Sequence, residues 1–222
     1  MRIFITGAPG TNKFVLSVNV SNKYKLDHFS FRSLVLDYIK SDEDDLDIVK
    51  AVWSKGAVFP PELAFKIVSK YMLSNVDNNY VLDGYPKGAI EAKILKEYLL
   101  KKKLTNNNYS IILNENIKNI YSIMEVKLIC LTCPYMINTV VASPILEQKC
   151  PYCHSILVKG NDKVYSNKTQ ISESYRRYKS EYRGIFSNLK EISKILVFNN
   201  NTQSEIINTT FEKINKYEYR FV

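Results

Sequence analysis

Short apolar runs alternate with longer amphipathic stretches along this chain of 222 residues, and no other feature constrains the fold as strongly. The five predicted strands are RIFIT, DHF, NYVLD, NYSIILN and KILVFN. Short apolar runs bounded by turn residues are typical of strands buried on both faces of a parallel sheet. The sequence therefore predicts an α/β fold, in which helices cover both faces of a five-stranded parallel sheet. Ligands should bind beyond the carboxyl ends of its strands.

The segments between the predicted strands carry start and stop signals of helices. The run DEDDLDIVKAVWSKG, residues 42–56, predicts a helix whose acidic first turn suits the helix dipole and which stops at Gly56. Pro61 falls in the first turn of the next predicted helix, where proline is tolerated. Such helices serve as crossovers between parallel strands, and these crossovers should be right-handed.

The first strand turns directly into the sequence GAPGTNK, which shares the first Gly and the Lys of the phosphate-binding loop G-x-x-x-x-G-K-[ST]. Gly7 and Gly10 allow backbone N–H groups to point at a phosphate, with a helix N-terminus behind them. Asn12 replaces the second Gly of the motif, and Phe14 replaces its Ser or Thr. Asn tolerates left-handed backbone better than other non-glycine residues. The predicted nucleotide-binding residues are Gly7, Pro9, Gly10, Thr11, Asn12 and Lys13.

The four cysteines form the pattern C-x2-C-x16-C-x2-C, made by Cys130, Cys133, Cys150 and Cys153. Two such pairs build a closed tetrahedral zinc site, and with four thiolates no position remains open for water. The predicted role of Zn²⁺ is therefore structural. Two disulfides or four unrelated thiols are the alternatives, and His154 is interpreted as a bystander beside the last cysteine.

The formal net charge is +9, with 31 Lys and Arg residues against 22 Asp and Glu residues. Such a balance suits nucleic acid, an anionic membrane or a phosphorylated ligand. The lysines are dispersed along helical stretches, which indicates a solvated surface and argues against a nucleic acid partner. No run approaches ~18 apolar residues, and glycine interrupts the N-terminal run at residue 7. We therefore expect a cytoplasmic (intracellular) monomer without a membrane partner.

The loop, the sequence VLDGYPK at the end of a central strand and the cysteine pairs occur in an order that resembles adenylate kinases (nucleoside monophosphate kinases) of the long, zinc-lid type. The resemblance covers essentially the whole chain. It implies that the loop wraps the phosphates of ATP and that a lid closes over ATP. It also implies that Asp83 helps to hold Mg²⁺ through water, although the need of this chain for Mg²⁺ stays open.

The resemblance implies a division into three parts. A core nucleotide-binding domain comprises residues 1–30, 59–127 and 166–222. A monophosphate-binding segment comprises residues 31–58, and a zinc-binding lid comprises residues 128–165.

The same resemblance reveals departures at positions that the family uses to bind the acceptor. The family motif D-G-F-P-R-T is DGYPKG at residues 83–88, so Lys87 keeps a charge but lacks the bidentate guanidinium. The Thr and Arg of the monophosphate pocket align with Phe31 and Leu36. The Gln that contacts adenine aligns with Glu91.

Further departures concern the phosphate-binding turn and the lid. Phe14 and Val15 stand where the family has a Gly and a hydroxyl residue. Other family arginines align with Ile123, with the VKL sequence of Val126–Leu128, with Gly160 and with Ser174. Arg177 follows on the same helix face as Ser174 and is placed to substitute in part. The candidate catalytic residues are Lys13, Asp83, Lys87, Lys127 and Arg177.

Phosphoryl transfer depends almost entirely on positioning and charge stabilisation, and loss of one arginine finger reduces the rate by roughly 10³–10⁵. We therefore predict an ATP-binding, adenylate kinase-like pseudoenzyme that binds AMP poorly and transfers phosphate very weakly or not at all. One alternative is a working nucleoside monophosphate kinase that relies on lysines. The other is a non-catalytic module whose zinc lid or basic surface binds a protein or RNA.

Overall fold

The computed structural model describes residues 1–41, 43–54, 57–74, 79–125, 127–130, 136–138, 149–150, 153–159 and 168–218. Its centre is a five-stranded parallel sheet in the order β2-β3-β1-β4-β8. The strands are β1 (Arg2–Gly7), β2 (Asp27–Ser30), β3 (Tyr80–Asp83), β4 (Asn108–Asn114) and β8 (Lys194–Asn199). This arrangement confirms the predicted α/β class and all five predicted strands of the sheet.

Eight helices lie around the sheet within the described residues. They are α1 (Lys13–Tyr24), α2 (Phe31–Tyr38), α3 (Leu46–Ser54), α4 (Pro61–Ser74), α5 (Ala89–Lys101), α6 (Ile117–Glu125), α7 (Lys168–Lys190) and α8 (Gln203–Glu218). Pro61 is the first residue of α4, as predicted. Within the described residues, every helix is too short or too polar to cross a bilayer.

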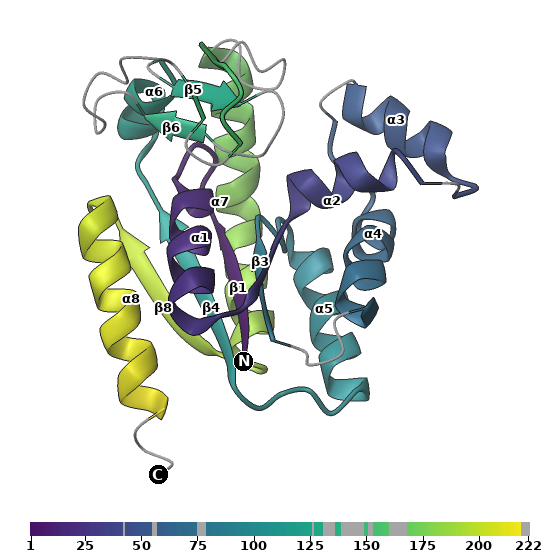
Figure 1. Ribbon diagram of the computed structural model, residues 1–222, viewed down its shortest axis with the longest axis vertical. Helices are drawn as coiled ribbons and strands as arrows, with labels where there is room; N and C mark the ends of the chain where they lie inside the picture. Colours follow the sequence, from purple (N-terminus) through teal and green to yellow (C-terminus); the bar gives the residue numbers. More distant parts are fainter. Residues whose placement is uncertain are drawn as a thin grey trace.

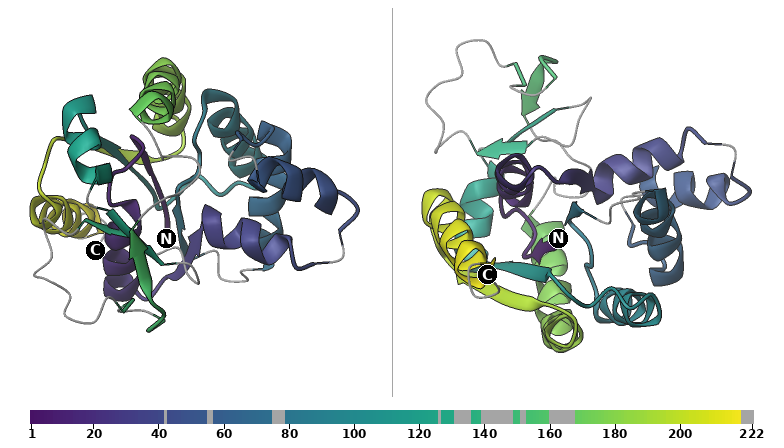
Figure 2. Two further views of the ribbon diagram at one scale, coloured as in Figure 1. Left: turned by 90° about the horizontal axis from the view of Figure 1, so that it is seen from above. Right: turned by 60° about the horizontal axis from the view of Figure 1, so that its bottom comes forward.

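The sheet is buried on both faces, which explains why its strands have apolar runs without polar alternation. On β1, Ile3 and Ile5 pack in the core formed with α1 and α8. Phe4, between them, packs in the core formed with α5 and α7. Because successive side chains of a strand point to opposite faces, one short run supplies both cores. The three layers are visible end-on in Figure 2.

A second, antiparallel sheet holds the described part of the cysteine-bearing segment. Its strands are β5 (Lys127–Cys130), β6 (Met136–Asn138) and β7 (Leu157–Lys159), in the order β6-β5-β7. This small sheet lies over the end of α1 that carries the loop after β1 (Figure 1). The resemblance implied a small zinc-binding lid at residues 128–165, whereas its strands were not predicted.

The predicted helix over residues 42–56 begins later than expected. The structure places its start at Leu46, so Glu43 and Asp45 precede α3 instead of forming its first turn. Residue 42 and the predicted end at Gly56 lie outside the described residues. The prediction was wrong at the start because it considered only the dipole of the helix itself.

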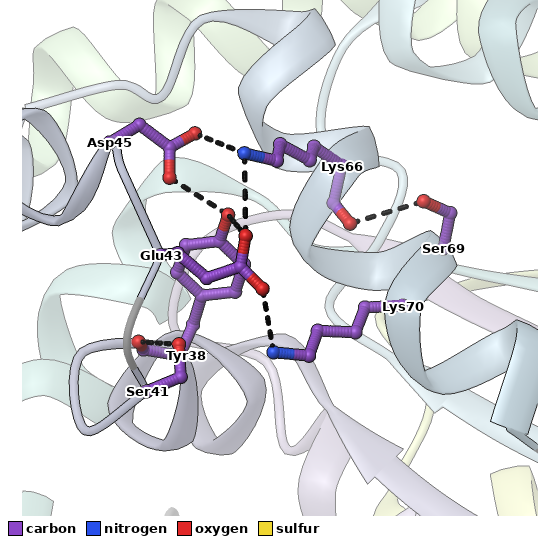
Figure 3. Close-up of polar contacts among 7 residues, drawn as sticks. All are labelled: Tyr38, Ser41, Glu43, Asp45, Lys66, Ser69 and Lys70. Atoms are coloured by element: carbon purple, nitrogen blue, oxygen red, sulfur yellow. Dashed lines mark hydrogen bonds and ion pairs between the residues drawn. The ribbon is translucent and has the colours of Figure 1, made fainter.

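The acidic residues before α3 instead bind lysines of α4 (Figure 3). Lys66 Nζ lies 2.9 Å from Asp45 Oδ2, and Lys70 Nζ lies 2.9 Å from Glu43 Oε1. The hydroxyl of Tyr38 donates to Asp45 Oδ1 at 2.8 Å. These bonds fasten the α2–α3 connection to α4, and the hydrogen bonds to lysine lower the pKa of both carboxyls.

Candidate functional site

The loop between β1 and α1 lies at the carboxyl edge of the sheet, and two glycines determine its path. Gly7 has φ +145°, and a Cβ there would clash with the carbonyl oxygen of Leu113 on β4. Gly10 has φ +83°, and a Cβ there would lie 3.1 Å from Met124 Sδ on α6. Asn12 has φ −79°, so its tolerance of left-handed backbone is not used. The replacement of glycine at this position therefore leaves the loop unstrained.

The ammonium of Lys13 folds back over this loop. Its Nζ donates to the carbonyl of Ala8 at 2.9 Å and to Thr11 Oγ1 at 3.0 Å. Among the described residues, no acidic side chain lies in the first turn of α1, and Asn12 makes no capping hydrogen bond. The positive end of the helix dipole and the lysine therefore lie together, which favours an anion at this turn.

Asp83 ends β3 beside the loop, and a histidine lies next to it. Asp83 pairs with Ile5 of β1 in the sheet and is buried. His28 Nε2 lies 3.8 Å from Asp83 Oδ2, and the His28 ring lies 5.3 Å from the Phe14 ring between centroids. This nitrogen is buried and has no hydrogen-bond partner among the described residues. A carboxylate and an imidazole thus face each other at the edge of the sheet.

Lys87 follows β3 and extends over an aromatic ring. Its Nζ lies 4.4 Å from the centroid of Phe31, a contact in the range of a cation–π interaction. The side chain reaches solvent, yet desolvation by the surrounding protein lowers the pKa of Lys87. The carboxylates of Glu91 and Asp83 oppose this shift in the pKa.

Two guanidinium groups act on the same lysine from different helices. Arg177 of α7 and Arg32 of α2 both add to the lowering of the Lys87 pKa, because like charges disfavour the ammonium. Arg32 is also held against α3, where its Cζ lies 5.4 Å from the ring centroid of Trp53. The charges of Arg32 and Arg177, which come from two different helices, thus act on Lys87 together with the carboxylates of Glu91 and Asp83.

Glu91, the residue aligned with the adenine-contacting Gln of the family, binds the start of α5. Its Oε2 accepts the backbone N–H of Lys87 at 2.6 Å, and the side chain is buried. Glu181 of α7 accepts the N–H of Ala89 at 2.7 Å. Desolvation raises the pKa of Glu91, while its hydrogen bonds to backbone N–H groups oppose the rise. Both carboxylates therefore stabilise the N-terminus of α5.

Three of the four cysteines converge in the small sheet. The sulfur atoms of Cys130, Cys150 and Cys153 all lie within 4.8 Å of one another, and those of Cys130 and Cys153 are 3.4 Å apart. Thiolates bound tetrahedrally to zinc at ≈ 2.3 Å are about 3.8 Å apart. The three residues thus fit a candidate metal site, whereas Cys133 lies outside the described residues. His154 is exposed and does not belong to this group.

The first turn of α1 lies directly against these cysteines. Phe14 is 8% exposed and is buried together with Cys130, Cys150 and Leu157. Val15 is partly buried and packs against the cluster that these residues form. The phosphate-binding turn and the cysteine site are thus in contact through apolar side chains.

Comparison with known proteins places this architecture. No family model matches the chain. An adenylate kinase of Mesomycoplasma hyopneumoniae is 30% identical over 164 residues, which cover 72% of this chain and 74% of that protein. The chain belongs to the adenylate kinase family. Adenylate kinases of Ruminiclostridium cellulolyticum and Rickettsia prowazekii are 27% and 23% identical, over 80% and 97% of this chain and 83% and 99% of their own lengths.

Family membership makes this a nucleotide kinase-like protein, and it confirms the resemblance inferred from the motifs. The structure brings Lys13, Asp83 and Lys87 to one edge of the sheet, and the charge of Arg177 on α7 acts on Lys87. For Lys127 only the backbone in β5 is described, and Gly160 lies outside the described residues. The roles of these adenylate kinase-like positions stay predictions.

Sequence analysis missed two residues at this adenylate kinase-like site. Arg32 lies one helical turn before Leu36, and side chains four residues apart share a helix face. That spacing would have pointed to Arg32. His28 lies two residues before Ser30, which pairs with Asp83, so strand alternation puts all three on one face. No sequence signal shows that pairing, because it depends on the order of the strands in the sheet.

Proposed function

We propose that this protein binds ATP through residues 7–13 and transfers phosphate between ATP and AMP very weakly or not at all. The observation that carries this proposal is the first turn of α1, where Phe14 is buried in one cluster with Cys130, Cys150 and Leu157, and Val15 packs against that cluster. We name the segment of residues 128–165 the lid. P-loop enzymes use a hydroxyl at this turn to hold Mg²⁺. An apolar turn leaves the metal without that ligand and favours binding that depends little on Mg²⁺.

The binding half of the proposal rests on the backbone of the loop. Gly7 and Gly10 keep positive φ angles, and the start of α1 carries no acidic side chain among the described residues. Lys13 already lies over the loop and exchanges its contacts with Ala8 and Thr11 for phosphate oxygens. Backbone N–H groups and one ammonium then supply the attraction. The proposed nucleotide-binding residues are Gly7, Pro9, Gly10, Thr11, Asn12 and Lys13.

The weak-transfer half of the proposal rests on side chains. Leu36 and Ile123 carry no charge where the family has arginines to hold the acceptor and the transferring group. Lys87 holds an anion as a point charge, without the fork of a guanidinium. Losses in acceptor positioning and in electrostatic stabilisation act on different parts of the barrier and should compound.

We assign the three predicted parts to this function. The core comprises residues 1–30, 59–127 and 166–222, and residues 31–58 form the monophosphate-binding segment. In the lid, Cys130, Cys150 and Cys153 hold Zn²⁺, with Cys133 as the fourth ligand. Four thiolates leave no open position, so the metal would supply folding energy rather than chemistry.

A second candidate function, a working nucleoside monophosphate kinase, is favoured by one observation. The positive charges of Arg32 and Arg177 act on Lys87, so the side that would bind AMP is influenced by cations at positions other than those of the family arginines. Arginine from any direction can stabilise a transferring phosphoryl group if its geometry is right. The candidate catalytic residues would then be Lys13, Asp83, Lys87, Lys127 and Arg177.

One pair of measurements tests these functions. Calorimetric titration with ATP, with and without Mg²⁺, should give weak binding of similar strength in both, and Lys13→Ala should abolish it. A coupled assay with ATP and AMP should give turnover far below the ordinary range of about 1–10³ s⁻¹. Turnover inside that range would establish the second candidate. Absence of ATP binding would leave the fold as a scaffold for another partner.

A further inference from the structure

Helix α1 buries two different apolar faces. Leu16 and Val20, four residues apart, pack in the core between α1 and the main sheet. Phe14 and Val18, also four residues apart, pack toward the lid. Residues with this spacing share one face of a helix, so the two pairs form two separate stripes. The second stripe supplies no ligand to phosphate in the proposed function.

The partner of the second stripe is the cysteine-bearing part of the lid. We define the lid contact as Phe14, Val15 and Val18 of α1 together with Leu128, Cys130, Cys150, Cys153 and Leu157. Cys130 and Cys150 are at most 1% exposed, and Leu157 is 1% exposed. Figure 1 shows β5 and β6 directly over this end of α1. The first turn of α1 therefore shields the thiol groups from solvent.

We propose that Phe14, with Val15 and Val18, is a docking face that holds the part of the lid around Cys130, Cys150 and Leu157 against the phosphate-binding turn before any nucleotide binds. An aromatic ring against sulfur and leucine side chains gives a stable apolar contact. The turn that it covers is the one whose backbone N–H groups and Lys13 would receive phosphate. The docked lid thereby restricts access to the loop, a part of the proposal that rests on the proposed function.

Two consequences follow from linkage between lid docking and the two sites. Weakening the contact should expose the thiols, because their burial depends on it. It should also strengthen ATP binding, because the competent fraction of the molecules rises. Both effects arise from a side chain that ligates no metal.

The test compares Phe14→Ala with the zinc-loaded, reduced wild-type protein. The cysteines of the Phe14→Ala variant should react with a chromogenic disulfide reagent on the order of 10- to 100-fold faster than those of the wild type. The variant should release zinc to a chromogenic chelator faster by a similar factor. Leu157→Ala should act similarly from the lid side. The double variant should show rates only slightly above those of either single variant, because both substitutions remove the same contact.

Two variants control for general loss of stability. Phe14→Leu keeps an apolar side chain and should behave nearly as the wild type. Phe65→Ala removes a ring from α4 that packs against Tyr98, away from the lid, and should leave thiol reactivity unchanged. Thermal unfolding shows whether each variant remains folded.

The outcomes separate the docking face from the proposed function. Unchanged thiol and zinc-release rates in folded Phe14→Ala would overturn the docking face, whether or not the protein binds ATP. Faster rates with unaltered ATP affinity would overturn the restriction of the loop. Faster rates in a protein that shows no ATP binding would support the docking face while refuting the proposed function.

Discussion

The two sides of the site, the loop of residues 7–13 and the acceptor side around Lys87, depart from the family in opposite ways. The loop keeps its backbone, because Gly7 and Gly10 lie against β4 and α6, but the side chains after Lys13 are apolar. The acceptor side lacks the arginine of the family at Leu36, yet the charges of Arg32 and Arg177 act on Lys87. Phosphate binding by backbone N–H groups depends on how the loop packs and therefore stays at one place in the fold. Phosphate binding by charged side chains can be taken over by residues at other positions.

The largest expected effect is at a loop glycine. Gly7→Ala should destabilise the protein by at least about 2 kcal/mol, because its Cβ would clash with Leu113 and its φ is positive. The matched change on the acceptor side is Gly88→Ala, whose Cβ would lie 3.6 Å from Glu181 Oε2 in ordinary contact. It should lower stability by less than about 1 kcal/mol. Chemical denaturation measures both, and equal losses would remove the contrast.

Replacing each of the two lysines by alanine tests whether the loop and the acceptor side bind different nucleotides. Lys13→Ala should weaken the already weak ATP binding at least about tenfold and so abolish measurable binding, since a charge-assisted bond to phosphate is lost. Lys87→Ala should leave ATP binding nearly unchanged and weaken the binding of AMP. Titration of each variant with each nucleotide gives the four values. A loss of ATP binding in Lys87→Ala would show that the two sides are a single anion site.

Moving the acceptor guanidinium tests whether its position matters. Arg32→Leu should weaken AMP binding by about three- to tenfold. Arg32→Leu combined with Leu36→Arg moves the charge by one helical turn on the same face and should restore most of the binding. Lys213→Leu, which removes a charge from α8 on the opposite face of the sheet, is the control. If Lys213→Leu weakened AMP binding equally, the effect of Arg32→Leu would be explained by the change in net charge alone.

The smallest expected effect is in the pH dependence of the acceptor side. Desolvation lowers the pKa of Lys87, so the ammonium loses its proton at a lower pH than an ordinary lysine. AMP binding should be full below that lowered pKa and decline about two- to threefold as the pH rises through it. Lys87→Arg keeps its charge and should not decline between about pH 7 and about pH 10. Parallel pH profiles would exclude Lys87 as the titrating group.

The sequence predicted the elements of the fold correctly where the local sequence signals agree with the tertiary packing. RIFIT and NYSIILN formed strands because both faces of the sheet are buried, and Pro61 began α4 because the first turn requires no N–H. The predicted start of α3 was wrong because Asp45 binds Lys66 and Glu43 binds Lys70 (Figure 3). These ion pairs join distant parts of the chain and have no local sequence signal.

The candidate site was predictable to the extent that its chemistry lies in one short segment. The loop glycines, Lys13 and the cysteine pairs were recognised from spacing alone. His28 was missed because its place beside Asp83 depends on strand order. Phe14 was recognised only as the loss of a small residue, since its contact with the lid joins segments more than a hundred residues apart.

The burial of Phe14 also limits which changes the chain can accept during evolution. A single return to glycine at this position would restore the small residue of the family but remove the ring that covers Cys130 and Cys150. The lid would then need a compensating apolar side chain before the reversal became neutral. Substitutions in the turn and in the lid are therefore expected to occur together. A hydroxyl residue could return to the loop without loss of stability only after the lid had gained a compensating apolar side chain.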